Sequence, residues 1–231
     1  MKKLILSLLV PLVLLLGSCD KKDSLTYSGM EAGTLSSGIF TTDNGVRMTV
    51  VGNEEKYDVS TSRRVLISYQ THPITDSEHI DIDLLALMEA GILLPDHVDA
   101  LDDSPAGSPI HVTDAWFSAG YLNLLTSFEG KDAEKHQSST TYTADADGIV
   151  IRLLHESTEQ SDSGTNSLMN AFLSIPMDEP VLSYEQFALS LGKKQADYPA
   201  AVLLQWTAPT LEGGPLTLYE RKGSYTPPVS N

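Results

Sequence analysis

The chain has 231 residues, a formal net charge of −16 at pH 7 and a single cysteine. A charge this negative argues against binding to nucleic acid and to anionic lipid headgroups. With one cysteine, the chain forms no internal disulfide. Its length allows either one large domain or two modest ones.

The N-terminus has the pattern of a lipoprotein signal peptide. Two lysines precede an apolar run over residues 4–16, which is too short to span a bilayer but has the length of a signal-peptide core. The next residues, Leu16-Gly17-Ser18-Cys19, resemble a lipobox, in which the thiol takes a diacylglycerol. We therefore predict a signal peptide over residues 1–18 and a lipid anchor at Cys19. The alternatives are an ordinary secretory signal with a coincidental cysteine and an uncleaved anchor.

A polar segment over residues 19–32 is predicted to tether the anchor to folded material. Asp20 directly follows the lipobox cysteine. In some Gram-negative bacteria an acidic residue here retains a lipoprotein at the inner membrane, and in others it promotes export to the surface. We expect anchoring at the outer membrane, and the tether leaves open whether the protein faces the periplasm or the exterior.

The remaining sequence predicts an all-β protein, because short β-branched runs alternate with clusters of Gly, Asn, Asp and Ser. A hairpin is predicted over residues 38–51, since its central Asn44-Gly45 pair accepts positive φ. Further strands are expected over residues 64–70 and 79–84. The side chains expected to point inward are Val65, Ile67 and Tyr69 in the first of these strands and Ile80, Ile82 and Leu84 in the second.

The middle of the chain contains a predicted domain boundary. Residues 85–95 fit either the end of a strand or a short helix. The segment over residues 95–109 is acidic, contains proline and has few apolar residues, which is typical of a boundary. Beyond it, strands are predicted over residues 110–117, 121–128, 137–142, 149–155, 168–175, 201–208 and 216–221. This pattern indicates a β-sandwich, and residues 184–192 form either a helix or a further strand.

Motifs along the whole chain resemble those of the NigD-like lipoproteins of Gram-negative gut and oral anaerobes. In chain order they are Gly33-Thr34-Leu35, Thr42-Asp43-Asn44-Gly45, Arg64-Val65-Leu66-Ile67-Ser68-Tyr69, Ile110-His111-Val112-Thr113-Asp114-Ala115-Trp116, Gly120-Tyr121-Leu122-Asn123, Lys135-His136 and Leu153-Leu154-His155. Their order and spacing carry the resemblance, since no single motif is specific. In the family the last motif is more often Leu-Arg-His-Asn. Leu154 and Glu156 depart from it, which argues against a role for a positive charge there.

The resemblance implies an OB-like β-barrel over residues 33–104, followed by an antiparallel β-sandwich over residues 105–231. This division agrees with the boundary predicted from composition. The family name refers to an association with bacteriocin production, and its members have no established biochemical activity. The resemblance therefore implies a fold and not a reaction.

The sequence contains no recognisable catalytic constellation. No Gly-x-Ser-x-Gly elbow occurs, and an acylated Cys19 is not available as a nucleophile. A hydrolase with a pair of carboxylates is left open by the many acidic residues, although Asp102-Asp103 resembles a solvated linker. We therefore predict that the protein is not an enzyme and has neither catalytic residues nor a cofactor.

Two segments are candidates for metal binding. His79, Asp81 and Asp83 share one face of a predicted strand, but the solvent face of an antiparallel strand gives the same pattern. Asp145-Ala146-Asp147-Gly148 resembles part of a calcium loop, yet it lacks the downstream glutamate and also fits a hairpin turn. No two histidines have i,i+4 spacing, and we predict no metal site. The histidines are His72, His79, His97, His111, His136 and His155.

Other residues bear on possible partners. An OB-like barrel can bind nucleic acid through a basic groove, but its basic residues are sparse here, and we predict no nucleic-acid binding. These residues are Arg47, Lys56, Arg63 and Arg64. Trp116, Trp206 and Tyr121 lie in apolar strands, where core packing competes with a role in ligand stacking. The polar segment 156–167 either contacts a partner or is disordered.

Taken together, these features predict a non-enzymatic, lipid-anchored protein of the cell envelope, attached to the membrane through Cys19. Its expected function is to bind a protein partner, for example as an accessory or immunity factor for a secreted peptide toxin. A surface carbohydrate-binding lipoprotein is the alternative, and it requires exposed aromatic side chains. A hydrolase with an unrecognised acidic pair is the third hypothesis.

Overall fold

The computed structural model describes residues 26–74, 79–102, 104–159, 167–210 and 214–228. The predicted signal peptide, Cys19 and residues 160–166 of the polar segment lie outside the described residues. The described ranges consist mainly of β-strands with one α-helix, which confirms the predicted all-β class. No helix in these ranges is long and apolar enough to cross a bilayer.

The strands of the first half are β1 (Ser28–Ser36), β2 (Ile39–Thr42), β3 (Arg47–Gly52), β4 (Arg63–Thr71) and β5 (Asp81–Ile92). The second half contains β6 (Pro95–His97), β7 (His111–Ser118), β8 (Tyr121–Gly130), β9 (His136–Asp145), β10 (Gly148–Ser157), β11 (Ser167–Pro176), β12 (Ala200–Pro209) and β13 (Leu216–Tyr225). The helix α1 spans Asp178–Ser190, and the short 3-10 helices η1 and η2 span Glu54–Lys56 and Ala133–Lys135. Residues 184–190 of the ambiguous segment 184–192 are therefore helical.

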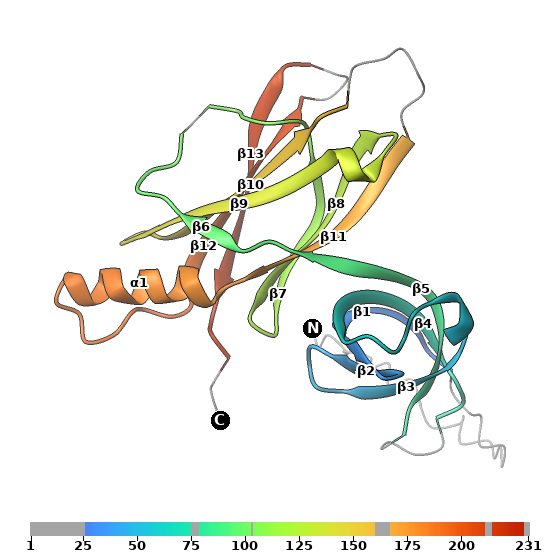
Figure 1. Ribbon diagram of the computed structural model, residues 1–231. Helices are drawn as coiled ribbons and strands as arrows, with labels where there is room; N and C mark the ends of the chain where they lie inside the picture. The colour runs from blue at the N-terminus through green and yellow to red at the C-terminus, as the bar shows by residue number, and fades with distance from the viewer. Residues whose placement is uncertain (1–25, 75–78, 103, 160–166, 211–213, 229–231) are drawn as a thin grey trace, which may run out of the picture.

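Strands β1 to β5 close into a barrel-like ring (Figure 1). Their order is β3-β2-β1-β4-β5, and β3 also pairs in parallel with β5, which closes the ring. Alternate side chains of each strand fill the interior. The buried interior consists of Leu35, Phe40, Met48, Val50, Val65, Ile67, Tyr69, Ile82 and Leu84, with Ile80 packed against it. The predicted inward faces of these strands are confirmed.

The predicted hairpin is formed by β2 and β3, in which Phe40 lies opposite Met48. Gly45 supplies the positive φ of its turn, at 83°. Gly33 of the first motif lies on β1 against this hairpin, and a Cβ atom there would overlap the carbonyl oxygen of Thr41. The close approach of two backbones therefore requires glycine at position 33.

The long strand β5 belongs to both halves of the molecule (Figure 1). Its first part pairs with β3 and β4, and residues 90–92 pair in parallel with β11. Residues 85–92, which fitted a strand or a helix, are therefore strand. The strand β1 begins within residues 19–32, the predicted tether, and β6 lies within residues 95–109, the predicted boundary segment. Backbone pairing with β4 and β9 orders these stretches although they have few apolar side chains.

The second half is a sandwich of two sheets. One contains β5, β11, β8 and β7 in this order, and the other contains β13, β12, β10, β9 and β6. Leu124 and Ile175 of the first sheet belong to the same buried core as Ile151 and Leu204 of the second. The helix α1 packs beside β9 at one end (Figure 1). The division into domains at residue 104 stays a prediction.

Candidate binding cleft

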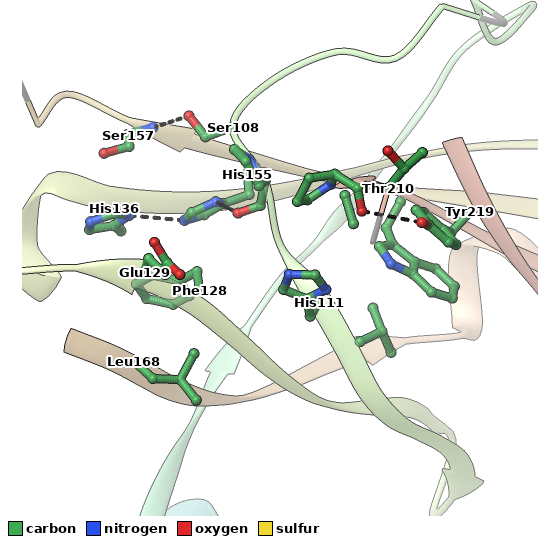
Figure 2. A pocket seen from close by; sticks show the side chains of 15 residues that line it. Ser108, His111, Phe128, Glu129, His136, His155, Ser157, Leu168, Thr210 and Tyr219 are labelled. Atoms are coloured by element: carbon green, nitrogen blue, oxygen red, sulfur yellow. Dashed lines mark hydrogen bonds between the residues drawn. The ribbon is translucent and has the colours of Figure 1, made fainter. Parts of the chain in front are cut away.

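A cleft of about 700 Å³ opens at one end of the sandwich (Figure 2). Strands from both sheets contribute to its walls, which are mostly apolar. The main apolar and aromatic contributors are Val112, Phe128, Leu168, Trp206, Ala208 and Tyr219. The polar contributors include His111, Glu129, His136 and His155. This combination of apolar walls and a few polar groups is typical of binding sites.

The cleft lies beside β7 and β13, the terminal strands of their sheets, whose side chains contact each other at two places. We call their line of contact the seam. Phe117 of β7 packs against Tyr225 of β13, with ring centroids 5.1 Å apart. Farther along the seam, Arg221 forms an ion pair with Asp114 at 3.2 Å. Beyond this pair both strands line the cleft, so the seam is closed in one half and open in the other.

An aromatic pair forms one wall of the cleft. The rings of Trp206 and Tyr219 are stacked, with centroids 6.0 Å apart and an interplanar angle of 18°. The Tyr219 hydroxyl donates to the carbonyl of Pro209 at 3.2 Å, which fixes the ring. Trp206 is half-buried and also packs against the sandwich core, so core packing and exposure to the cleft coexist there.

Two histidines form the opposite wall. The imidazoles of His136 and His155 are stacked with an interplanar angle of 9°. Phe128 packs on both, with centroids 4.6 Å from His136 and 4.7 Å from His155. The three side chains also line a second cavity of about 530 Å³. They therefore separate two cavities, and Figure 2 shows the histidines side by side.

Hydrogen bonds engage both ring nitrogens of His155 and determine its tautomer. Nδ1 of His155 lies 3.1 Å from the carbonyl oxygen of Pro109, which only accepts, so this nitrogen carries a proton. In a neutral His155 the other nitrogen then accepts from Nδ1 of His136, 3.2 Å away. Nε2 of His136 lies 3.4 Å from the carboxylate of Glu159, an ion-pair distance rather than a short hydrogen bond.

Burial lowers the pKa of His155, and the nearby His136 acts in the same direction, although the carbonyl of Pro109 opposes them. The pKa of Glu159 is also lowered, chiefly because the backbone N–H of Lys131 donates to its carboxylate. Asp132 contributes a second backbone donor at 2.7 Å. At neutral pH this wall therefore combines a neutral His155 with an ionised Glu159.

These pKa shifts predict that acid destabilises the protein. Because the folded pKa of His155 lies below its ordinary value of 6.5, the unfolded chain binds a proton more readily below that pH. The resulting stability is present above about pH 6.5 and is lost as the pH falls, with a slope of at most about 1.4 kcal/mol per pH unit. Urea unfolding between about pH 7 and 5 measures this slope. It should flatten in His155→Gln and persist in His111→Gln, and an unchanged slope in His155→Gln would contradict the assignment.

A second polar cluster joins the ring to the sandwich. The guanidinium of Arg64 donates to both carboxylate oxygens of Asp43, at 2.8 and 2.7 Å. It also donates to Asn123 at 2.8 Å and to Ser174 at 2.9 Å. Ser118 donates to Asp43 and accepts from Asn123. We call these five residues the Arg64 cluster; they come from both halves of the chain.

The Arg64 cluster is a buried and fully paired network. Burial raises the pKa of Asp43, but the hydrogen bonds from Arg64 and Ser118 outweigh this effect, so its pKa lies below the ordinary value. The ring of Tyr121 lies against the guanidinium, 4.3 Å from its carbon. Because the polar groups of the Arg64 cluster already bond to one another, few of them are left to bind a ligand. The cluster therefore has a structural role.

The structure places the metal candidates as follows. The side chain of Asp83 lies 2.8 Å from His72 of the neighbouring chain segment. Asp145 accepts from the backbone of Asp147 in the turn between β9 and β10, as in a hairpin. Within the described ranges, no three His, Cys, Asp or Glu side chains form a group that could hold a metal ion.

Other predicted residues have structural contacts. Trp116 stacks on Phe172 between the ring and the sandwich, with centroids 5.9 Å apart, and does not line the cleft. Arg63 pairs with the carboxylate of Asp58 at 3.1 Å. The carboxylate of Asp102 accepts from the backbone of Ser104, and its neighbour Asp103 lies outside the described residues. None of these contacts belongs to the cleft.

Sequence reasoning did not identify the cleft, although it named several of its residues. Its walls come from β7 through β13, and neighbours in space are far apart in sequence. The only available signal was that His136 and His155 each belong to a motif of the family resemblance.

Solved structures share this architecture. A NigD-like immunity protein from Bacteroides caccae matches 87% of this chain and 97% of its own, with a TM-score of 0.57 and 19% identity. The chain has the NigD-like fold. A candidate lipoprotein from Bacteroides fragilis matches 85% of this chain and 97% of its own, with a TM-score of 0.55 and 14% identity. A protein of unknown function from Bacteroides vulgatus matches 88% and 92%, with a TM-score of 0.54 and 15% identity.

No family profile and no curated protein matches the sequence. The NigD-like fold nevertheless confirms the all-β class, with a barrel-like ring followed by a sandwich. The predicted antiparallel sandwich is corrected to one of mixed sheets, because β10 pairs with β12, β6 with β9 and β5 with β11 in parallel. At identities below 20% the likeness concerns the fold, and the cleft and its histidines stand on this chain's own geometry.

Proposed function

We propose that the protein is a non-enzymatic accessory lipoprotein of the cell envelope that binds a protein partner in the cleft. The cleft itself carries the proposal, because about 700 Å³ with apolar and aromatic walls is left open between two sheets. Apolar surface that is exposed in this way generally marks an interaction site. The anchor at Cys19 would keep this site close to the membrane.

The charge of the molecule supports a basic partner. The whole chain carries a formal charge of −16. Among the residues that line the cleft, Glu129 is a carboxylate, and there is no lysine or arginine. Complementary charge accelerates association and favours partners with positive charge. The description of the Bacteroides caccae protein as an immunity protein agrees with a polypeptide partner.

The hydrogen bonds of His155 argue against a role for this ring as a general base. Both nitrogens of His155 are engaged, one by Pro109 and the other by His136. A general base needs a nitrogen within reach of the substrate, and this ring has none to offer. The B. fragilis neighbour supports the assignment as an envelope lipoprotein.

A glycan is the second candidate ligand, because Trp206 and Tyr219 present stacked rings to the cleft. Aromatic rings with polar tips suit the apolar faces of sugars. Trp116 offers no such surface, since it packs on Phe172. The protein partner is favoured because the remaining lining includes apolar side chains from several strands, among them Val112, Phe128 and Leu168.

Photo-crosslinking in intact cells tests the proposed function. A benzophenone amino acid is placed at Leu168 or Thr210, which line the cleft, and at Leu182 of α1 as a matched exposed control. We expect a protein adduct from the cleft positions that is missing from Leu182. A Cys19→Ser variant, which cannot take a diacylglycerol, controls for anchoring.

The proposal is contradicted if the cleft positions yield no adduct, or if Leu182 yields the same adducts. An adduct that disappears after glycosidase treatment would instead identify a glycan-bearing partner. Mass spectrometry of the adduct identifies its polypeptide.

A further inference from the structure

Among the residues that the structure describes, no strand pairs with the outer edge of β13 along the open half of the seam. β13 is the terminal strand of its sheet, and all ten of its residues pair regularly with β12. The corresponding edge of β7 is interrupted by a register shift between Val112 and Asp114. Bulges blunt the edge of a sheet, whereas a regular edge can accept another strand. Of the two edges at the cleft, β13 is therefore the better template.

The backbone pairing identifies the free hydrogen-bonding groups of β13. The carbonyl of Thr207 accepts from Ile110 and therefore points away from β13. Its partner Leu218 then occupies a position whose N–H and C=O point away from β12. Because this pattern alternates, Leu216, Glu220 and Lys222 share that orientation. The amides of these residues face outward on the edge.

The distribution of charge along β13 distinguishes its two halves. In the closed half of the seam, β13 carries Arg221 and Lys222, and charged residues of this kind protect an edge from pairing. In the open half, the stretch over residues 216–219 reads Leu-Thr-Leu-Tyr and has no charge. The unprotected part of the edge thus includes Tyr219, the residue through which β13 lines the cleft.

We propose that the partner binds as an extended segment that adds a strand to residues 216–220 of β13 and inserts alternate apolar side chains into the cleft. This inference rests on the proposed function and specifies how the partner binds. Main-chain hydrogen bonds provide affinity in this mode, and pockets for every second side chain provide specificity. The acidic chain and the absence of lysine and arginine from the cleft lining favour lysine or arginine at the intervening positions.

Synthetic peptides test this mode with the purified, lipidated protein in detergent. The probe is an eight-residue peptide that alternates lysine and valine, and its control has four lysines followed by four valines. We expect the alternating peptide to bind and to slow hydrogen exchange at the amides of Leu218 and Glu220. The amide of Lys222 should be unaffected. Equal binding of both peptides, or unchanged exchange at Leu218, would overturn the proposal.

Proline substitutions provide matched variants. Leu218→Pro removes an outward N–H in the open half, and Lys222→Pro removes the equivalent N–H in the closed half, so neither removes a bond to β12. We expect about tenfold weaker peptide binding for Leu218→Pro and no change for Lys222→Pro. If Leu218→Pro does not fold, the test is whether the alternating peptide slows hydrogen exchange at Leu218 in the unmodified protein. In the absence of peptide, hydrogen exchange at Leu218 could also slow as the protein concentration rises. That result would show that a second copy of this chain pairs with the edge, and it would overturn the proposal.

The two hypotheses fail in different ways. If Leu168 and Thr210 crosslink a protein in cells and Leu218→Pro captures it equally well, the proposed function stands and strand addition is wrong. If no protein is captured from the cleft, the proposed function itself fails.

Discussion

Replacing Arg64 with methionine is expected to lower the free energy of unfolding by about 3–5 kcal/mol. The substitution leaves the carboxylate of Asp43 buried without its charge partner and removes donors to Asn123 and Ser174. The side chains of Arg64 and Asp43 are only 8% and 7% exposed, so water does not replace the lost bonds. Urea denaturation at neutral pH measures the change.

The matched control is Arg221→Met, which removes an ion pair between side chains that are 45% and 59% exposed. A surface pair of this kind contributes less than about 1 kcal/mol. The double variant Arg64→Met with Asp43→Asn should recover part of the loss, because the unpaired charge is gone. A loss of under about 1 kcal/mol for Arg64→Met would show that the Arg64 cluster does not hold the ring and sandwich together.

Replacing Phe172 with alanine is expected to cost about 3–5 kcal/mol and to weaken the coupling between the ring and the sandwich. Phe172 is 1% exposed and lies with Ala32 and Leu66 in a small core between the two parts. Its ring stacks on Trp116. In a Trp206→Phe background, the fluorescence of Trp116 reports on this core, and its transition should precede the loss of far-UV circular dichroism.

Leu168→Ala is the control on the same strand, since its side chain is 66% exposed. A surface truncation of this kind changes stability by less than about 0.5 kcal/mol. The prediction is contradicted if fluorescence and circular dichroism show the same transition in Phe172→Ala and the loss of unfolding free energy is no larger than in Leu168→Ala.

Most strands were predictable because their side chains alternate between buried and exposed positions. Val65, Ile67 and Tyr69 show this directly, since all three face the ring interior. The run after Leu84 was ambiguous because β5 leaves the ring and enters the second sheet, so its burial does not follow one period. The start of β1 was missed because its residues, Ser-Gly-Met-Glu over 28–31, include few apolar side chains.

The candidate site was much less predictable than the fold. Phe128, His136 and His155 come together only after three strands pair in two different sheets. Periodicity describes one element at a time, so it says nothing about such convergence. Asp43, Arg64 and Asn123 lie in three separate motifs, and a shared network was not apparent from their spacing.

The position of β1 has a mechanical consequence. In the proposed anchored state, a pull on the folded part reaches the membrane through the residues that precede β1. This strand is not an edge strand, because it pairs with β4 over eight residue pairs and with β2 over four. A pulling force on a bound partner would therefore act on the hydrogen bonds of β1 to both β2 and β4. The strand β13 is hydrogen-bonded to one neighbour, β12, and would separate from its sheet first.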